Sequence, residues 1–231
     1  MTDALRVKRR KQVKWFIYYL IAVIASRTVL LLPRKLSLRL GVLLGDLVFL
    51  LSRKEKIRAI ENLSIAFGGE KTQSDIVSIC RRCFENLGKG LMEVLQIPRL
   101  TPENLGKLVT FEGRQIVDDS LRMGKGIVLV TAHLGNWELL ASLALSGYKT
   151  NTIIRPVRSP RLDEMVNRNR ERAGVKCIQR GSAVKSAFRC LKRNEVLVIL
   201  ADIDTKVDGV FADFFGRPAF TPRGPVNIAL R

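Results

Sequence analysis

Apolar residues recur with helical spacing over the first hundred residues of the chain. The apolar runs Trp15–Ala25 and Thr28–Leu32 are closed by Pro33. Leucines at helical spacing predict a second helix over 35–51, and a third is expected over 53–67, ended by two glycines. Residues 74–95 predict a long amphipathic helix, whose apolar stripe comprises Ile76, Ile79, Cys80, Cys83, Leu87 and Leu91.

After residue 105 the pattern changes to short apolar runs that alternate with helical stretches. A strand over 109–112 and a helix over 114–123 are expected first. Further strands are predicted over 127–132, 150–154, 175–179 and 196–201, with helices over 137–146, 161–172 and 183–191. This alternation predicts an α/β fold with a mostly parallel sheet flanked by helices. We therefore divide the chain into a membrane anchor or interfacial helix (1–34), a helical part (35–105) and an α/β catalytic core (106–231).

The N-terminal apolar segment indicates a membrane location. A cluster of basic residues precedes it, and no small-residue cleavage site of a signal peptide follows it. A spanning helix needs about 20 apolar residues, and this segment reaches that length only if Arg27 is included. A helix that lies in the interface of an anionic membrane fits the pattern equally well.

The run Ile127–Ala132 ends in a short polar motif that could carry chemistry. The motif begins with His133, the only histidine of the chain, and ends with Glu138. On one helix, residues five apart point roughly 140° away from each other, so only a strand–turn–helix bend at Gly135 and Asn136 could bring the two side chains together. Glu138 would then orient His133 as a general base. The alternative is a structural histidine and a carboxylate that merely favours a helix N-terminus.

The motif His133–Glu138 resembles the histidine–four residues–acid signature of glycerolipid and lipid A acyltransferases. With Gly135, Asn136 and Trp137 it is most similar to the late acyltransferases of lipid A biosynthesis, the lauroyl and myristoyl transferases. Other segments agree in their order along the chain: Leu63–Phe67, Arg155-Pro156, Arg170–Gly174 and Gly209–Thr221. Compared with this family, a C-terminal portion of the α/β core is absent. The stretch 222–225 is expected to turn into a helix that begins at Val226.

Sites of parallel α/β sheets lie at the carboxyl ends of the strands. His133 follows one predicted strand, Arg155 ends another, and Asp202 and Asp204 follow the last. The resemblance implies that Arg155 and Arg170 hold a phosphate or the tetrahedral oxyanion; the alternative is a solvated basic face. Asp202-Ile203-Asp204 departs from the family, which more often has glutamine between the acids.

Phenylalanines gather in the stretch 209–220, which its glycines and proline predict to be a loop. Phe211, Phe214 and Phe215 are candidates for an acyl-chain groove, and their alternative role is to cap the edge of the sheet. Arg217 and Arg223 are candidates for anionic head groups, and Asn136 completes the substrate-binding candidates.

The formal net charge of +19 favours anionic partners, such as an acidic carrier protein, an anionic membrane or nucleic acid. The four cysteines are expected to be free thiols. No metal site is expected, because Cys80 and Cys83 lack a second ligand pair and the two aspartates lack a nearby histidine or cysteine.

The resemblance implies an acyltransferase without cofactor, which moves a fatty acyl chain from a thioester of acyl carrier protein or coenzyme A to a hydroxyl of a lipid A precursor or related glycolipid. We expect a monotopic enzyme at the cytoplasmic face of the inner membrane, because a fully spanning anchor would separate the core from a cytosolic thioester. The alternatives are a glycerophospholipid or mannoside acyltransferase, or a non-enzymatic basic protein that binds membrane or nucleic acid.

Overall fold

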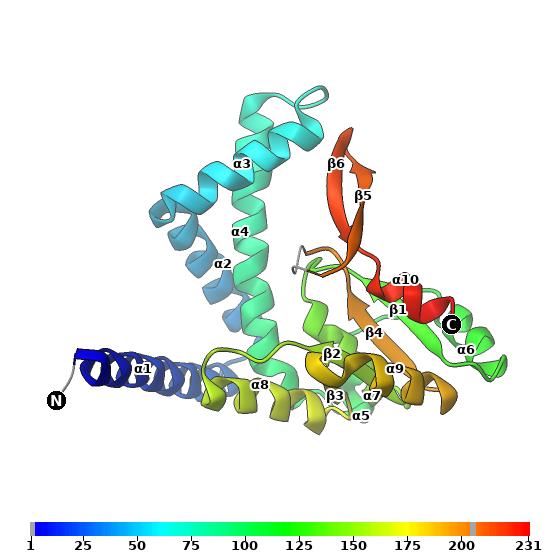
Figure 1. Cartoon of the computed structure of the whole chain (residues 1–231). Coiled ribbons are helices and arrows are strands. Elements are labelled where there is room, and N and C mark those ends of the chain that lie inside the picture. The colour runs from blue at the N-terminus through cyan, green and yellow to red at the C-terminus, as the bar shows by residue number, and fades with distance from the viewer. Residues whose placement is uncertain (1–2, 204–206) are drawn as a thin grey trace.

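The computed structural model describes residues 3–203 and 207–231, which form a helical part followed by an α/β part (Figure 1). The helical part contains α1 (Asp3–Leu31), α2 (Arg34–Leu51), α3 (Arg53–Phe67) and α4 (Gln73–Gln96). A short 3-10 helix, η1 (Ile97–Arg99), and α5 (Pro102–Leu105) lead to α6 (Arg114–Arg122). Residues 109–112 form no strand, so that prediction was wrong: the segment has two apolar residues and adjoins Gly113, whose φ of 72° starts α6 instead.

The α/β part is built on four parallel strands, as the alternating pattern predicted. These are β1 (Ile127–Thr131), β2 (Thr150–Ile154), β3 (Lys176–Gln179) and β4 (Val196–Leu200). The strand order is β1-β4-β2-β3, so β4 lies inside the sheet and β1 at its edge. At this edge, Val130 of β1 is 56% exposed, whereas Val196, Leu197 and Val198 of β4 are buried.

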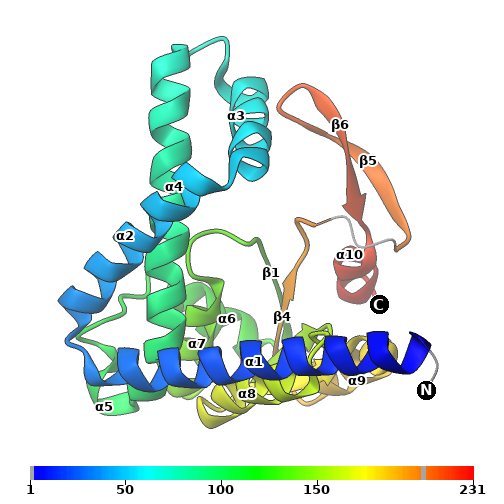
Figure 2. The same ribbon diagram turned by 90° about the vertical axis from the view of Figure 1, so that its left-hand side faces the viewer.

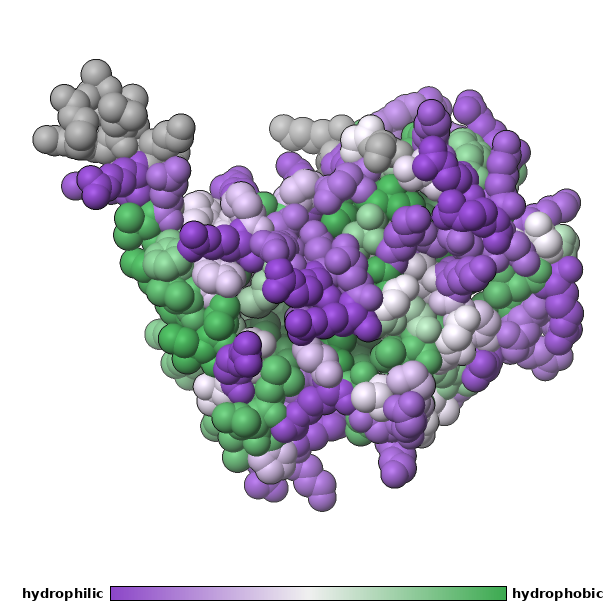
Figure 3. Space-filling model, turned by 90° about the horizontal axis from the view of Figure 1, so that it is seen from below, coloured by the Kyte–Doolittle hydropathy of each residue, from purple (hydrophilic) through white to green (hydrophobic). Residues whose placement is uncertain are grey.

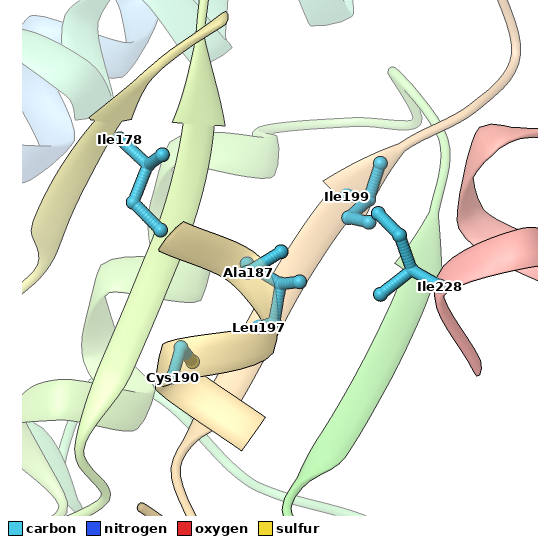
Figure 4. Packing of buried hydrophobic residues seen from close by; sticks show 6 residues of the cluster. All are labelled: Ile178, Ala187, Cys190, Leu197, Ile199 and Ile228. Atoms are coloured by element: carbon cyan, nitrogen blue, oxygen red, sulfur yellow. The ribbon is translucent and has the colours of Figure 1, made fainter. Parts of the chain in front are cut away.

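Helices cover the sheet and close its core. The connecting elements are η2 (Trp137–Leu140), α7 (Ala141–Leu145), α8 (Pro160–Arg172), η3 (Arg180–Ser182), α9 (Ala183–Lys192) and α10 (Gly224–Ala229). On one face, Leu197 and Ile199 of β4 pack with side chains of α9 and α10, as Figure 4 shows. A second, smaller cluster joins Ala141 of α7 to Ala173 and Val175 around the start of β3.

The stretch 209–222 is an antiparallel hairpin and not the predicted loop. Its strands are β5 (Gly209–Phe214) and β6 (Arg217–Pro222), and both turn residues, Phe215 and Gly216, have positive φ. Two residues of positive φ make the tight turn whose twist matches a hairpin, and the phenylalanine in the first position hid that signal in the sequence. Figure 1 shows the hairpin standing beside α3, where Phe215 contacts Phe67 with ring centroids 5.9 Å apart.

Helix α4 is the centre of the helical part, and its start is fixed by a capping box. The Thr72 hydroxyl accepts from the Asp75 N–H at 3.2 Å, and the Asp75 carboxylate accepts from the Thr72 N–H at 3.1 Å. The predicted apolar stripe is partly wrong, because Cys83, Leu87 and Leu91 are exposed. The buried positions are Ile76, Cys80, Phe84, Gly88, Met92 and Gln96.

The buried stripe of α4 is rotated relative to the predicted one, because α2 crosses α4 at glycine residues. A Cβ atom on Gly88 would lie 1.9 Å from the carbonyl oxygen of Gly41, and one on Gly45 would lie 2.4 Å from that of Phe84. The two backbones therefore touch without intervening side chains.

Gly88→Ala is expected to lower the free energy of unfolding by about 2–3 kcal/mol, because the added methyl group forces two backbones apart. Gly90→Ala is the matched control on the same helix, since its Cβ would meet only the Asn136 Cβ at 3.9 Å. The control is expected to stabilise the chain by roughly 0.5–1 kcal/mol through helix propensity. Urea unfolding measures both, and a Gly88→Ala variant as stable as the control would contradict this packing.

Candidate functional site

His133 lies on a bend between a strand and a helix, as the motif predicted. Strand β1 ends two residues earlier at Thr131, Gly135 turns the chain with φ 58°, and η2 begins at Trp137. Asn136 precedes this helix and does not cap it through its side chain. Its amide instead donates to Glu93 of α4 at 3.3 Å, so Asn136 links the bend to the helical part.

The carboxylate that contacts His133 is Asp202 and not Glu138. The Nδ1 atom of His133 lies 2.8 Å from Oδ1 of Asp202, and the His133 backbone N–H donates to Oδ2 of the same residue at 2.8 Å. The sheet explains this pairing: Thr131 of β1 is in register with Leu200 of β4, and each functional residue follows two positions later. Asp202 was predicted to lie on this edge of the sheet, but its pairing with His133 depends on strand order.

The contact with Asp202 also selects the tautomer of the neutral imidazole. Burial alone would raise the pKa of the Asp202 carboxyl, but the hydrogen bonds from the His133 ring and backbone outweigh it and lower that pKa. An ionised carboxylate only accepts hydrogen bonds, so Nδ1 is the nitrogen that carries the proton. In the neutral ring, Nε2 of His133 is then the nitrogen that holds the lone pair a general base requires.

Glu138 forms an ion pair with Arg170, which corrects its predicted role. Arg170 Nε donates to Oε2 at 2.8 Å, and a second guanidinium N–H donates to Oε1. The third guanidinium nitrogen donates to Asn167 at 3.2 Å. Burial alone would lower the pKa of Arg170, but the Glu138 carboxylate outweighs it and raises that pKa. Glu138 therefore holds η2 against α8, and Arg170 has its charge compensated.

A cavity of about 630 Å³ opens at the carboxyl ends of the strands. Of the predicted site residues it is lined by His133, Glu138, Arg155, Arg170 and Arg223. Arg155 directly follows β2, is exposed, and forms no ion pair with any carboxylate in the described part of the chain. Arg223 is paired with Asp208, which also lines the cavity. Arg155 is therefore better placed than Arg170 or Arg223 to bind an anion.

The remaining candidates do not line this cavity. Phe211, Phe214 and Phe215 lie on the hairpin with 73%, 65% and 52% exposure, so a shared acyl groove with His133 is not formed by these residues in this arrangement. Arg217 begins β6 and is also exposed. The hairpin carries these side chains away from the sheet, because it extends beyond the carboxyl ends of the strands (Figure 1).

No group of three potential metal ligands occurs among the described residues. Asp202 is engaged by His133, and Asp204 lies outside the described residues. The four cysteines are free: Cys80 and Cys190 are buried, Cys83 is exposed, and Cys177 is half-buried. Burial raises the pKa of the Cys190 thiol to about 11, so this cysteine stays protonated at neutral pH.

Comparison with known protein families gives a match over nearly the whole chain. The model of the bacterial lipid A biosynthesis acyltransferases matches residues 6–231. The chain belongs to this family. The resemblance inferred from the motif at His133 is thereby confirmed, and so is the α/β fold with a helical N-terminal part.

The curated relatives of this family member carry the name of enzymes that acylate a mannoside. A phosphatidylinositol mannoside acyltransferase of Mycobacterium tuberculosis (strain ATCC 25618 / H37Rv) is 26% identical over 153 residues, which cover 63% of this chain and 48% of that protein. The enzyme of the same name from Mycolicibacterium smegmatis is 24% identical over 143 residues, covering 60% of this chain and 47% of that protein. The chain thus spans about half the length of the curated relatives it matches.

We predict that Glu138→Gln lowers the free energy of unfolding by about 2–3 kcal/mol, because it leaves the half-buried Arg170 guanidinium without its counter-charge. Glu164→Gln on α8 is the matched control, since its ion pair with Arg168 is exposed on both sides. The control is expected to change stability by less than about 0.5 kcal/mol. Denaturant unfolding checks both, and equal effects of the two variants would refute a structural role of the Glu138–Arg170 pair.

Proposed function

We propose that the protein transfers a fatty acyl chain from a thioester to a hydroxyl group of an anionic glycolipid, with His133 as general base. The observation that carries this proposal is the hydrogen bond between Asp202 and the Nδ1 atom of His133, at the mouth of a cavity in an acyltransferase of this family. The thioester belongs to acyl carrier protein or coenzyme A, and no cofactor takes part.

The reaction needs two proton transfers, one to His133 and one from it. Nε2 of His133 takes the proton of the acceptor hydroxyl while its oxygen attacks the thioester carbonyl carbon. The carbon–sulfur bond then breaks, and the departing thiolate receives the proton from the imidazolium. Asp202 stabilises the imidazolium between these two steps and keeps Nδ1 as the protonated nitrogen. Direct transfer suits this site, because the motif around His133 offers neither serine nor cysteine as a nucleophile.

Two acceptors have specific support. The family model favours a lipid A precursor, and the curated mycobacterial relatives favour a mannoside of a phosphoinositide. Both acceptors are sugars attached to an anionic lipid, and Arg155, which lines the cavity, is suited to their phosphate groups. The proposed location is the cytoplasmic face of the inner membrane, where a thioester of acyl carrier protein or coenzyme A is available. Contact with a membrane is supported by the apolar helix segment Gln12–Leu31, which has the length and composition of a membrane span.

His133→Ala is expected to reduce kcat/KM by about 10²–10⁴-fold, which is the usual contribution of a general base. Asp202→Asn is expected to reduce it by about 10²-fold or more, because the amide cannot stabilise an imidazolium. Asp208→Asn is the control, as this carboxylate lines the cavity but contacts Arg223 instead. The assay follows radiolabelled acyl transfer from acyl carrier protein and from coenzyme A to each of the two acceptors. A His133→Ala variant within about tenfold of the unmodified chain would refute the base.

For Arg155→Gln we expect KM for the phosphorylated acceptor to rise about tenfold with kcat little changed, because one charge-assisted contact with phosphate is lost. Arg158→Gln, an exposed arginine outside the cavity lining, is the matched control. Comparison with a dephosphorylated acceptor separates the two explanations: if Arg155 binds the acceptor phosphate, the variant loses nothing on that substrate. An equal rise in KM on both acceptors contradicts the assignment.

A further inference from the structure

Helix α2 packs against α4 mainly through its small residues, and of its aromatic side chains Phe49 contacts Phe84 of α4 with ring centroids 5.7 Å apart. Its buried positions are Ser37, Gly41 and Gly45, which lie on α4 where the two backbones touch. Ser37 also accepts a hydrogen bond from Gln96 of α4 at 2.9 Å. In a helix of a water-soluble protein the large apolar side chains face the core, and α2 reverses that arrangement.

Seven of the eight leucines of α2 consequently face outwards, and Leu38 is half-buried. At about 3.6 residues per turn the seven fall within an arc of roughly 120° on one side of the helix. All seven are exposed, with Leu43 at 62%, Leu50 at 69% and Leu51 at 73%. The leucine face, as we name it, comprises Leu36, Leu40, Leu43, Leu44, Leu47, Leu50 and Leu51. A continuous apolar face of this kind marks a binding surface and is rare on a soluble monomer.

Helix α1 presents a second apolar face on the same side of the molecule. Figure 2 shows α1 and α2 both on the side that faces the viewer. The exposed apolar residues of α1 are Val13, Phe16, Ile17, Tyr18, Leu20, Ile21, Ile24 and Leu31. Figure 3, which views the molecule from below, shows a green hydrophobic band along the left-hand edge. Only Leu32 and Pro33 separate the two helices along the chain.

Contacts with the rest of the protein hold α1 in place along its length. The Arg161 guanidinium of α8 lies over the rings of Phe16 and Tyr19, at 4.7 and 5.8 Å from their centroids. At the other end of α1, Gln96 donates to the carbonyl oxygens of Val29 and Leu32 at 3.2 and 3.3 Å. If α1 crossed the bilayer in this arrangement, the charged helix α8 would enter the hydrocarbon beside it, at a cost of several kcal/mol for each unpaired charge.

We propose that the leucine face of α2 and the exposed face of α1 together seat the protein in the surface of an anionic bilayer, with both helices in the plane of the membrane. Basic residues border these faces: Lys14 and Arg27 on α1, Lys35 and Arg39 on α2. They match anionic head groups and, with a net charge of +19, oppose a second copy of the chain as the occupant. In this arrangement α2 contacts the membrane as much as α1 does, although α2 lacks the composition of a membrane span.

The test is flotation of the full chain with vesicles of equal parts phosphatidylethanolamine and phosphatidylglycerol. Leu43→Glu/Leu50→Glu is expected to weaken binding about a hundredfold, near tenfold for each leucine withdrawn from the membrane. Ile116→Glu/Val184→Glu is the matched control: these residues of α6 and α9 are 71% and 59% exposed, and the double variant adds the same charge. The control is expected to bind within about twofold of the unmodified chain.

A neutral variant separates hydrophobic contact from charge. Leu43→Gln/Leu50→Gln must also weaken binding, by about tenfold or more, and circular dichroism checks that each variant keeps its helices. Normal binding of the glutamine variant, or equal losses in the α2 variant and the control, overturns the proposal. It is also overturned if the leucine variants only dissociate a lipid-free oligomer in light scattering and leave vesicle binding unchanged.

The position of α2 in the bilayer is read from a fluorophore on Leu47→Cys in a Cys83→Ser background. Its emission is expected to shift to the blue on adding vesicles, whereas a fluorophore on Ile116→Cys stays unchanged; an unshifted fluorophore at position 47 contradicts insertion. None of these measurements needs acyl transfer. The His133→Ala variant is therefore expected to bind vesicles normally. A result that refutes the proposed membrane contact is thus distinguishable from one that refutes the proposed reaction.

Discussion

The parallel pairing of β1 with β4 is the constraint on which the candidate site depends. It holds Thr131 opposite Leu200, and the ladder continues with a hydrogen bond from the Ala201 N–H to the Thr131 carbonyl at 3.0 Å. His133 and Asp202 therefore leave the sheet at the same level and meet through two hydrogen bonds. A base and its orienting acid are thus positioned by the backbone of a buried strand, which is more rigid than a contact within one flexible loop.

The ion pair of Glu138 with Arg170 has a different task from the one its motif suggested. The pair joins η2 to α8 beside the site. The carboxylate and the guanidinium compensate each other's charge. An arginine whose charge is already compensated contributes little to binding a phosphate or an oxyanion. Arg155, which follows β2 and has no ion pair with a carboxylate among the described residues, is left as the better anion-binding group. The acid of the motif thus supports the site's framework, and the acid that supports the imidazole comes from another strand.

The sequence predicted the bounds of helices and strands better than it predicted which of them lie next to one another. The bounds of α3 and β2 agree with their apolar runs residue for residue, because glycine, proline and polar residues punctuate those runs sharply. Strand order leaves no such local signal, so Asp202 was placed on the correct edge without its partner. The hairpin was missed for a local reason: Phe215 occupies a turn position of φ 53° that glycine or asparagine usually fills. The buried stripe of α4 was misjudged because a glycine contact with α2 displaced larger side chains.

Water and the proposed membrane surface together explain where the apolar residues of the chain lie. In the α/β part, the apolar residues gather inside, around Leu197 and Ile199, as expected for a domain in water. In α2 seven of the eight leucines face outwards, although nothing in the pattern of that helix distinguishes an outward from an inward apolar face. The backbone contact at Gly88 decides between them, because only the small side of α2 fits against it. The same glycines that bring two helices together thereby turn seven leucines away from the protein, towards a surface that water would solvate poorly.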